Sequence, residues 1–525
     1  MKINSTIDKI RAEKNNIYAV FAVTFIVLMA INGFFFMGFS FGHDSWDVSL
    51  IFKEVHKNVR FTQGRPMAFA VNEILFQSLN LPWIIGIIEC INISLLSLLI
   101  IKMIDIKSRF YQVITAIIVG SNISIISINC FLQDGTIFTL GFLLATLGAY
   151  FYSKDSLLNY ILGTLVITIS INLYQAHFVV AFSLCALLLF KDIISDDFSF
   201  KNVLIKILKM LISLAVAMII YIVTWDIILK ITGLERTPYL GMDNLGIDSI
   251  KKIPYLIIPT FQYAVKELFL PGFRSYIPVY LTVMNIIMSV SAVYLAVKSI
   301  LKKNNKKLQI LFFAILILAL PLIIFFNYIL SFGATETLPG KFSFVVVPIL
   351  IIYIMYLNDH KIARVLSAIF AFIIFINSFV GGNVVSAKRR YEYENGMAFA
   401  NQIISRIQNE PGFTPNKKIM FIGGDYNHAL LGSKDIYTSN QDIPSWVSEL
   451  DNSSLNENAS IVPAKNLATV ATCRACDIPY TKGINYTTTV DGFIVSKNVE
   501  ATAENIENDF KYSDHNPVKL TFRLN

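Results

Sequence analysis

The segment IYAVFAVTFIVLMAINGFFFMGFSF, residues 17–41, decides the fold class of this chain. It contains no charged residue and exceeds the roughly 20 apolar residues that a helix needs to cross a bilayer. It is longer than the apolar part of a signal peptide, and no small-residue cleavage site follows it. We therefore expect a first membrane span that is retained, preceded by Lys2, Lys9, Arg11 and Lys14.

The composition extends this interpretation to most of the chain. Of its 525 residues, 55% are hydrophobic and 15% are charged, and the mean hydropathy is +0.59. A soluble protein carries about a quarter charged residues, so lipid must cover much of the apolar surface. The net charge of +8 is modest, and no basic helix or basic–aromatic cluster is present. We therefore expect no nucleic-acid partner.

Hydropathy predicts an α-helical polytopic membrane domain over residues 1–389 and a small C-terminal α/β domain over residues 390–525. Lys and Arg concentrate in alternate short connections, which predicts a cytoplasmic N-terminus. About eleven spans then place the tail outside, although the basic cluster at residues 388–390 counts against this orientation. The predicted spans are 17–40, 82–101, 110–131, 136–152, 158–173, 176–190, 207–229, 277–298, 308–330, 342–357 and 362–384.

Three segments on the non-cytoplasmic side are long enough to carry chemistry: 41–81, 232–276 and the tail. Four prolines in 232–276 are expected to break it into short pieces. In the tail, Cys473 and Cys476 form either a local disulfide or two free thiols. The tail is also expected to contain a helix over 392–409 and strands over 418–424, 492–497 and 518–524.

The first of these segments carries the main catalytic candidates. Apolar residues from Val48 to Val59 recur at helical spacing, which predicts an amphipathic helix along the membrane surface. Asp44 precedes this helix and Asp47 lies at its start. Either carboxylate, with its pKa raised by burial, is a candidate general base for a sugar hydroxyl. The alternative is that Asp44 caps the helix and Asp47 is solvated.

Further polar residues lie near the same face. Arg65, in Gly64-Arg65-Pro66, either binds a phosphate through its planar guanidinium or snorkels at a loop end. Asp134 lies in a tight turn between two spans, and Tyr174 and Gln175 lie at a span end. His177 beside them is either a proton carrier or a hydrogen-bonded interfacial histidine. Arg274 and Lys341 are also predicted on this face.

Several cofactor and nucleotide motifs are missing. The sequence has no P-loop, no GxGxxG after a strand, no HExxH and no GxSxG. We therefore expect neither cofactor nor metal. An enzyme of this kind needs a donor carried by lipid.

Three motifs carry a resemblance: His43-Asp44-Ser45-Trp46, Gln63-Gly64-Arg65-Pro66 and Leu173-Tyr174-Gln175. They resemble integral-membrane glycosyltransferases of the GT-C type, and more closely the serotype-converting O-antigen glucosyltransferases of enteric bacteria and their phages, the Gtr family. The start of the tail, through residues 419–424, is also similar. Family members often show two adjacent acids before the Trp, so this chain leaves open whether Asp44 or Asp47 is the base.

The resemblance implies a multi-pass protein of the bacterial inner membrane with a periplasmic tail. Glucose would pass from undecaprenyl-phosphate glucose to a sugar of the lipid-linked O-antigen, which is serotype conversion. Asp44 would be the first choice for the base, Arg65 would position donor or loop, and Arg274 and Lys341 would contact phosphate. Tyr174, Gln175 and Asp134 would join the substrate site. The expected partners are membrane lipid, both lipid-linked substrates, and a small flippase and a donor synthase encoded alongside.

Two other function classes stay open. An O-antigen polymerase has similar spans and large periplasmic loops, but the soluble tail is unexpected for it. A lipid-linked sugar flippase or transporter usually shows paired repeats and charges at mid-membrane depth, whereas the charges here are expected at the outer ends.

Overall fold

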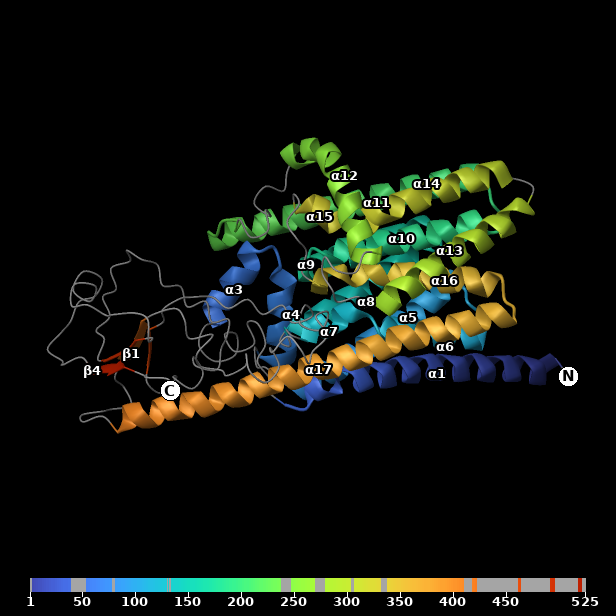
Figure 1. The fold of residues 1–525 in the computed structure, drawn as a ribbon. Coiled ribbons are helices and arrows are strands. Elements are labelled where there is room, and N and C mark those ends of the chain that lie inside the picture. The colour runs from blue at the N-terminus through green and yellow to red at the C-terminus, as the bar shows by residue number, and fades with distance from the viewer. Residues whose placement is uncertain are drawn as a thin grey trace.

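The computed structural model describes residues 2–38, 53–77, 81–129, 131, 134–237, 247–269, 279–303, 306–331 and 338–409, with four short strands in the tail. This part of the chain forms a bundle of helices that run side by side (Figure 1). Ten stretches of it are helical, long and apolar enough to cross a membrane, so the predicted polytopic class is confirmed. They are carried by α1 (Lys2–Phe36), α5 (Pro82–Ile104), α6 (Arg109–Gly120) with α7 (Ile123–Asn129), α8 (Gly135–Tyr152), α10 (His177–Ile194), α11 (Phe200–Thr232), α13 (Val279–Leu301), α14 (Lys306–Ile324), η3 (Leu338–Val345) with α16 (Val346–Leu357), and α17 (Lys361–Gln408).

The eleventh predicted span, 158–173, is α9 (Leu157–Leu173). Its 17 residues make a helix of about 25 Å, shorter than the roughly 30 Å hydrocarbon core. It is therefore an apolar helix outside the ten candidate spans. α9 packs closely on α8, because a Cβ on Gly148 or on Gly163 would lie within 3.0 Å of the other residue's carbonyl oxygen. Small residues allow such close approach between helices in a membrane.

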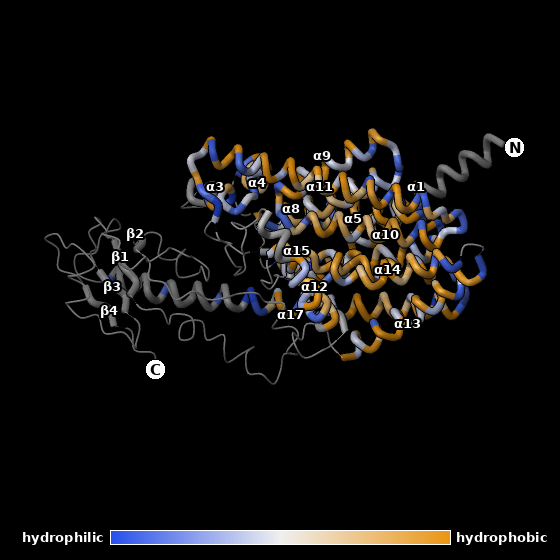
Figure 2. The backbone as a smooth tube through the Cα atoms, turned by 90° about the horizontal axis from the view of Figure 1, so that it is seen from above, coloured by the Kyte–Doolittle hydropathy of each residue, from blue (hydrophilic) through white to orange (hydrophobic). Residues whose placement is uncertain are grey.

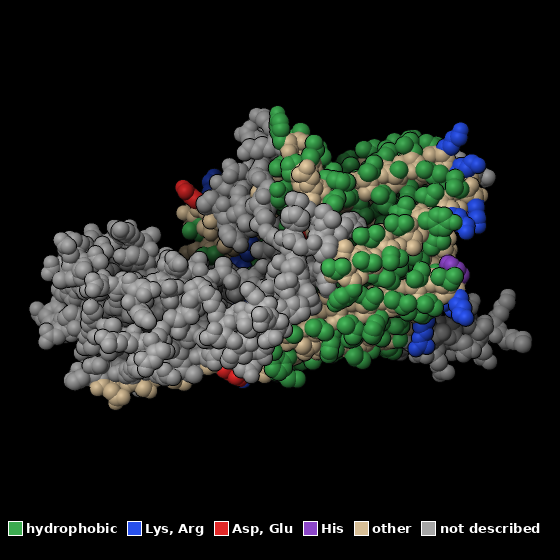
Figure 3. Space-filling view, in the orientation of Figure 1, with side chains coloured by type: hydrophobic (Ala, Val, Ile, Leu, Met, Phe, Trp, Pro, Cys, Tyr) green, Lys and Arg blue, Asp and Glu red, His purple; other side chains and the backbone are tan. Residues whose placement is uncertain are grey.

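The sides of the bundle are apolar and its two ends are polar (Figure 2). On α11, for example, Ile212 and Ile219 are exposed. Isolated exposed apolar residues are ordinary, but here they cover the flanks continuously (Figure 3). A continuous apolar flank fits a lipid environment rather than water.

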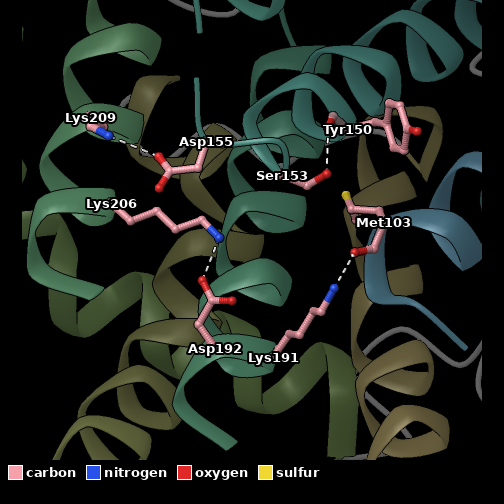
Figure 4. A network of polar contacts seen from close by, with 8 residues as sticks. All are labelled: Met103, Tyr150, Ser153, Asp155, Lys191, Asp192, Lys206 and Lys209. Atoms are coloured by element: carbon pink, nitrogen blue, oxygen red, sulfur yellow. Dashed lines mark hydrogen bonds and ion pairs between the residues drawn. The ribbon is translucent and has the colours of Figure 1, made fainter. Parts of the chain in front are cut away.

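Lysine and arginine gather at one end of the bundle, called the basic end below (Figure 3). Cross-helix hydrogen bonds occupy helix-terminal carbonyls there. Lys191 of α10 donates to the carbonyl of Met103 at the end of α5, at 3.0 Å (Figure 4). Gln309 donates to the carbonyls of Ile193 and Ser195, at 2.9 and 3.0 Å. Because the last four carbonyls of a helix have no partner within it, these contacts stabilise the basic end.

The opposite end, called the loop end, carries two helices of the first predicted loop. The predicted amphipathic helix is present from Lys53 as α3 (Lys53–Thr62). A second helix that the sequence analysis did not predict follows, α4 (Pro66–Phe76). Pro66 occupies its first turn, where a missing backbone N–H removes no helical hydrogen bond.

In the described part of the second predicted loop, two of the four prolines do not break the chain into short pieces. Residues 247–269 form one helix, α12 (Ile247–Phe269), with Pro254 and Pro259 inside it. The prediction was wrong for these two prolines, because each removes only one backbone donor. Packing supports the rest, since Thr260 and Ala264 are fully buried. Pro238 and Pro271 lie outside the described residues.

Two predicted spans are interrupted instead. The span 110–131 divides into α6 and α7 around Asn122, whose Oδ1 accepts a hydrogen bond from the backbone N–H of Ser124 at 2.8 Å. The Asn122 amide also donates to the carbonyl of Phe342 in η3, at 3.3 Å. The span 308–330 likewise divides into α14 and α15 (Phe326–Leu330). Local side-chain bonding to the backbone thus interrupts the helix at Asn122 without interrupting the hydropathy.

The helix predicted over 392–409 is not separate but continues the last span as part of α17. The strands predicted at 418–424, 492–497 and 518–524 coincide with β1, β3 and β4, and β2 was not predicted. Their order is β2-β1-β3-β4, with β1, β3 and β4 parallel and β2 antiparallel to β1. No described helix packs extensively on these strands, so a C-terminal α/β domain is not supported. The strands are β1 (Lys418–Ile422), β2 (Ile461–Pro463), β3 (Gly492–Val495) and β4 (Val518–Thr521).

Candidate functional site

The turn between α3 and α4 is fixed to the bundle through its backbone carbonyls. The Gln175 amide, between α9 and α10, donates to the carbonyls of Gln63 and Gly64 at 2.5 and 3.1 Å. The hydroxyl of Tyr221 on α11 donates to the Gly64 carbonyl at 3.1 Å. The indole N–H of Trp225 donates to the Phe61 carbonyl at 2.7 Å. Two segments distant in sequence, the α9–α10 connection and α11, therefore set the position of this turn.

Glycine is required at the centre of the turn. Gly64 has a φ of +73°, a conformation that other residues adopt only with strain. A Cβ at this position would lie 2.3 Å from the Tyr221 hydroxyl and 2.7 Å from the Gln175 amide nitrogen. The turn approaches α11 as closely as it does because residue 64 has no side chain.

Arg65 lies beside two other predicted site residues. Its guanidinium carbon is 4.5 Å from the ring centre of Tyr174, within the range of a cation–π contact. Its Nε donates to the Gln175 side-chain oxygen at 3.5 Å, at the long limit of a hydrogen bond. The structure therefore brings together Arg65, Tyr174 and Gln175, which the sequence named from two separate motifs.

Asp134, a further predicted site residue, belongs to a buried ion pair. Nη2 of Arg60 on α3 lies 2.6 Å from both carboxylate oxygens of Asp134, and both side chains are 8% exposed. Asp134 precedes α8 but makes no side-chain capping bond to it. The carboxylate instead joins α3 to the start of α8.

Lys341 forms a second buried ion pair at the loop end. Its ammonium lies 2.8 Å from Glu267 of α12, with side-chain exposures of 1% and 4%. It also lies 5.2 Å from the ring centre of Tyr263, on the same helix. Lys341 therefore joins η3 to α12.

Comparison with known proteins adds the family. A sequence profile of the glucosyl transferase GtrII family matches residues 33–358, which is more than half of the chain. The chain belongs to the glucosyl transferase GtrII family. No individual curated protein and no solved structure matched it.

The GtrII match includes every predicted site residue. Arg65, Asp134, Tyr174, Gln175 and Lys341 all lie at the loop end, in two groups joined through α8, α10 and η3. The remaining three, Asp44, Asp47 and Arg274, lie outside the described residues. Their predicted roles as base and phosphate contact therefore stay predictions.

Several residues of the loop end were not predicted from the sequence. Arg60, Tyr221 and Trp225 hold loop-one elements in place, yet hydropathy treats them as ordinary helix residues. Glu89 was also missed, although an acid inside a predicted span is itself a signal of function. It is 2% exposed within α5, so the expectation that charges lie only at the outer ends was wrong for this residue.

His177 is buried at the start of α10. Its Nδ1 lies 2.8 Å from the carbonyl of Ser170, and its ring occupies the space beside Gly141 that a side chain there would fill. Of the two predicted roles, the geometry fits a hydrogen-bonded histidine rather than a proton carrier. Among the described residues, no group of three or more His, Cys, Asp or Glu side chains is placed to hold a metal ion.

Proposed function

We propose that this GtrII-family chain transfers glucose from undecaprenyl-phosphate glucose to a sugar of the lipid-linked O-antigen. Transfer takes place at the loop end, on the periplasmic side of the bacterial inner membrane. The observation that carries the proposal is the convergence of α3, α4, Asp134, Gln175 and η3 at the end of the bundle opposite the basic end. In a membrane protein the Lys/Arg-rich end faces the cytoplasm, which supports a periplasmic site.

The reaction needs three functions from the protein. A carboxylate takes the proton of the acceptor hydroxyl as its oxygen bonds to the anomeric carbon of glucose, while the bond to the phosphate oxygen breaks. Asp44, with Asp47 as the second choice, is the proposed base. Cations near the headgroup level stabilise the leaving phosphate through charge-assisted hydrogen bonds, and Arg65, Arg274 and Lys341 are proposed for this role. The fixed turn at Gly64 positions Arg65.

The donor test uses purified protein in lipid vesicles with a lipid-linked O-antigen acceptor. One reaction receives undecaprenyl-phosphate glucose and the other receives UDP-glucose. The proposal expects glucosylated acceptor in the first reaction and none in the second. Transfer from UDP-glucose alone would refute the donor assignment.

The acceptor and the biological outcome need a separate test. The O-antigen of a host with and without the gene is compared by mass and linkage analysis. A single added glucose per repeat supports serotype conversion. A change in chain length without added glucose would favour the alternative of an O-antigen polymerase, and no covalent change would favour a lipid-linked sugar flippase or transporter.

A further inference from the structure

A buried carboxylic acid lies inside the loop end. Glu89 is located two turns into α5 from Pro82 and is 2% exposed. Neither of its carboxylate oxygens has a hydrogen-bond partner among the described residues. An acid in this setting is costly to keep in a membrane protein, and such residues usually belong to a functional site.

Two buried amides share this property. Both polar atoms of Asn32 on α1 and both of Asn129 on α7 are buried without a partner in the described part of the chain, and each residue is 1% exposed. The ring of Phe36 fills the space beside Gly86, where α1 and α5 run antiparallel. One turn further into the bundle, Asn32 and Glu89 therefore lie at the same level. Asn129 ends α7 at the loop end.

The start of α8 lies at the same place. A Cβ on Gly135, the first residue of α8, would lie 1.7 Å from Oε1 of Glu89, so the carboxylate lies directly against this helix terminus. Asp134, the residue positioned to cap α8, instead binds Arg60. The first turn of a helix has unsatisfied N–H groups and a partial positive charge, which favour an anion.

At the basic end, polar side chains donate hydrogen bonds to backbone carbonyls of neighbouring helices. There, Lys191 and Gln309 occupy helix-terminal carbonyls across helices. At the loop end a carboxylate and two entire amides lack partners among the described residues, whereas Gln309 lacks one only for its Oε1. Buried polar groups in native proteins are almost always satisfied, so these atoms require a ligand or water.

We propose that Glu89, with Asn32 and Asn129, binds the hydroxyl groups of a hexose substrate. A carboxylate accepts hydrogen bonds, an amide both accepts and donates, and a sugar hydroxyl can do both in return. The inference rests on the proposed glucosyl transfer and adds to it a binding site beside the first turn of α8, next to the Arg60–Asp134 pair. The hexose is either the glucosyl group of the donor or the acceptor sugar, since both present the same chemistry.

The test compares Glu89→Met and Glu89→Gln with the wild-type protein in lipid. Glu89→Met is expected to raise the thermal unfolding midpoint, because it removes an unpartnered buried acid, and to lower kcat/KM roughly 10- to 100-fold. Glu89→Gln, which keeps an acceptor oxygen, is expected to lose less. A rise in the KM for the lipid-phosphate donor assigns the site to glucose, and a rise in the KM for the O-antigen acceptor assigns it to the acceptor sugar.

Two more variants make the result decisive. Asn32→Leu is expected to act in the same direction as Glu89→Met, and it replaces that variant where folding fails. Gln309→Met is the matched control, expected to lower the unfolding midpoint and to leave both KM values unchanged. Wild-type kcat/KM in both Glu89→Met and Asn32→Leu would overturn the inference, as would a loss of activity that only follows a loss of stability. Failure of the wild-type protein to use the polyprenyl donor would refute the proposed function instead.

Discussion

Gly64 shows at the residue scale how one position fixes a loop. Its positive φ would strain any other residue. The hydroxyl of Tyr221 also leaves no space for a side chain. Gly233, at the end of α11, has a nearly equal φ of +69°, but a Cβ added there would have no atom within 4 Å. Comparing the two positions therefore distinguishes the effect of backbone strain from the effect of close contact with neighbouring atoms.

The prediction is that Gly64→Ala lowers transfer activity by about tenfold or more, whereas Gly233→Ala does not. Both variants acquire a left-handed alanine, which costs on the order of 1 kcal/mol. Only Gly64→Ala must also move the α3–α4 turn away from Tyr221 and Gln175. The measurements are kcat/KM and the unfolding midpoint. Equal activities in the two variants would contradict the assigned role of the turn.

The second prediction at the residue scale concerns Asp44, the proposed general base. Asp44→Asn is expected to lower transfer by about 10²–10⁴, the usual effect of removing a general base. An immunoblot of membranes checks that the variant is inserted and abundant. If only Asp47→Asn is inactive, the base is Asp47. Near-normal O-antigen modification in both variants would exclude a mechanism based on the first loop.

At the scale of elements, α12 is attached to η3 through charge and aromatic contacts. Glu267 and Tyr263 of α12 both contact Lys341 of η3. A buried ion pair contributes little in net stability, because both charges are desolvated, but breaking it leaves one buried charge uncompensated. The pair therefore makes the position of α12 depend on both partners.

We expect Lys341→Met and Glu267→Gln each to lower the free energy of unfolding, with a loss of about 3–5 kcal/mol where a charge stays buried. The double variant Lys341→Met/Glu267→Leu should recover much of the loss. Asp155→Asn, which breaks an exposed pair with Lys209, is the control and should change stability by less than about 1 kcal/mol. Additive losses in the double variant would contradict the pairing.

The donor KM of the same variants tests the second role of Lys341. A phosphate ligand predicts a higher donor KM in Lys341→Met alone. Glu267→Gln should then leave the donor KM unchanged or lower it, because it removes a competing carboxylate. Equal KM values in all variants would restrict Lys341 to joining η3 and α12.

The whole molecule is polarised along the bundle axis. Lysine and arginine gather at the basic end (Figure 3), and the described residues proposed for chemistry lie at the other end of the bundle. Cytoplasmic loops of membrane proteins carry the excess of Lys and Arg, so the basic end should face the cytoplasm. The continuous α17 carries the chain to the loop end and beyond it (Figure 1).

The corresponding prediction concerns orientation. Fusions of a pair of reporters, one active in the cytoplasm and one in the periplasm, are made after Lys307 and after Asn525. The fusion after Lys307 should report the cytoplasm and the fusion after Asn525 the periplasm. A cytoplasmic signal at Asn525 would overturn the periplasmic assignment of the tail and, with it, the odd number of crossings expected from the sequence.

The sequence by itself determined the membrane class, the positions of most spans and the polarity of the two ends. These features depend on composition within a single segment, because a run of apolar residues is stable in lipid whatever it later packs against. The motif Gly64-Arg65-Pro66 and the pair Tyr174-Gln175 were also recognisable as sites of interest. Their mutual contact was not, since 110 residues separate Arg65 from Gln175.

Only the tertiary structure decided which polar groups are paired. Asp134 looked like a turn residue until Arg60 of another helix was placed against it, and the pairing of Lys341 with Glu267 was not predicted. Prolines in α12 and the break at Asn122 were settled in the same way, by packing and side-chain bonds from distant segments. Hydropathy averages over a window along the chain, whereas the pairing of a buried charge depends on which helices are neighbours. Hydropathy therefore includes Glu89 in an apolar span. The folded protein shows it as a buried acid without a partner among the described residues.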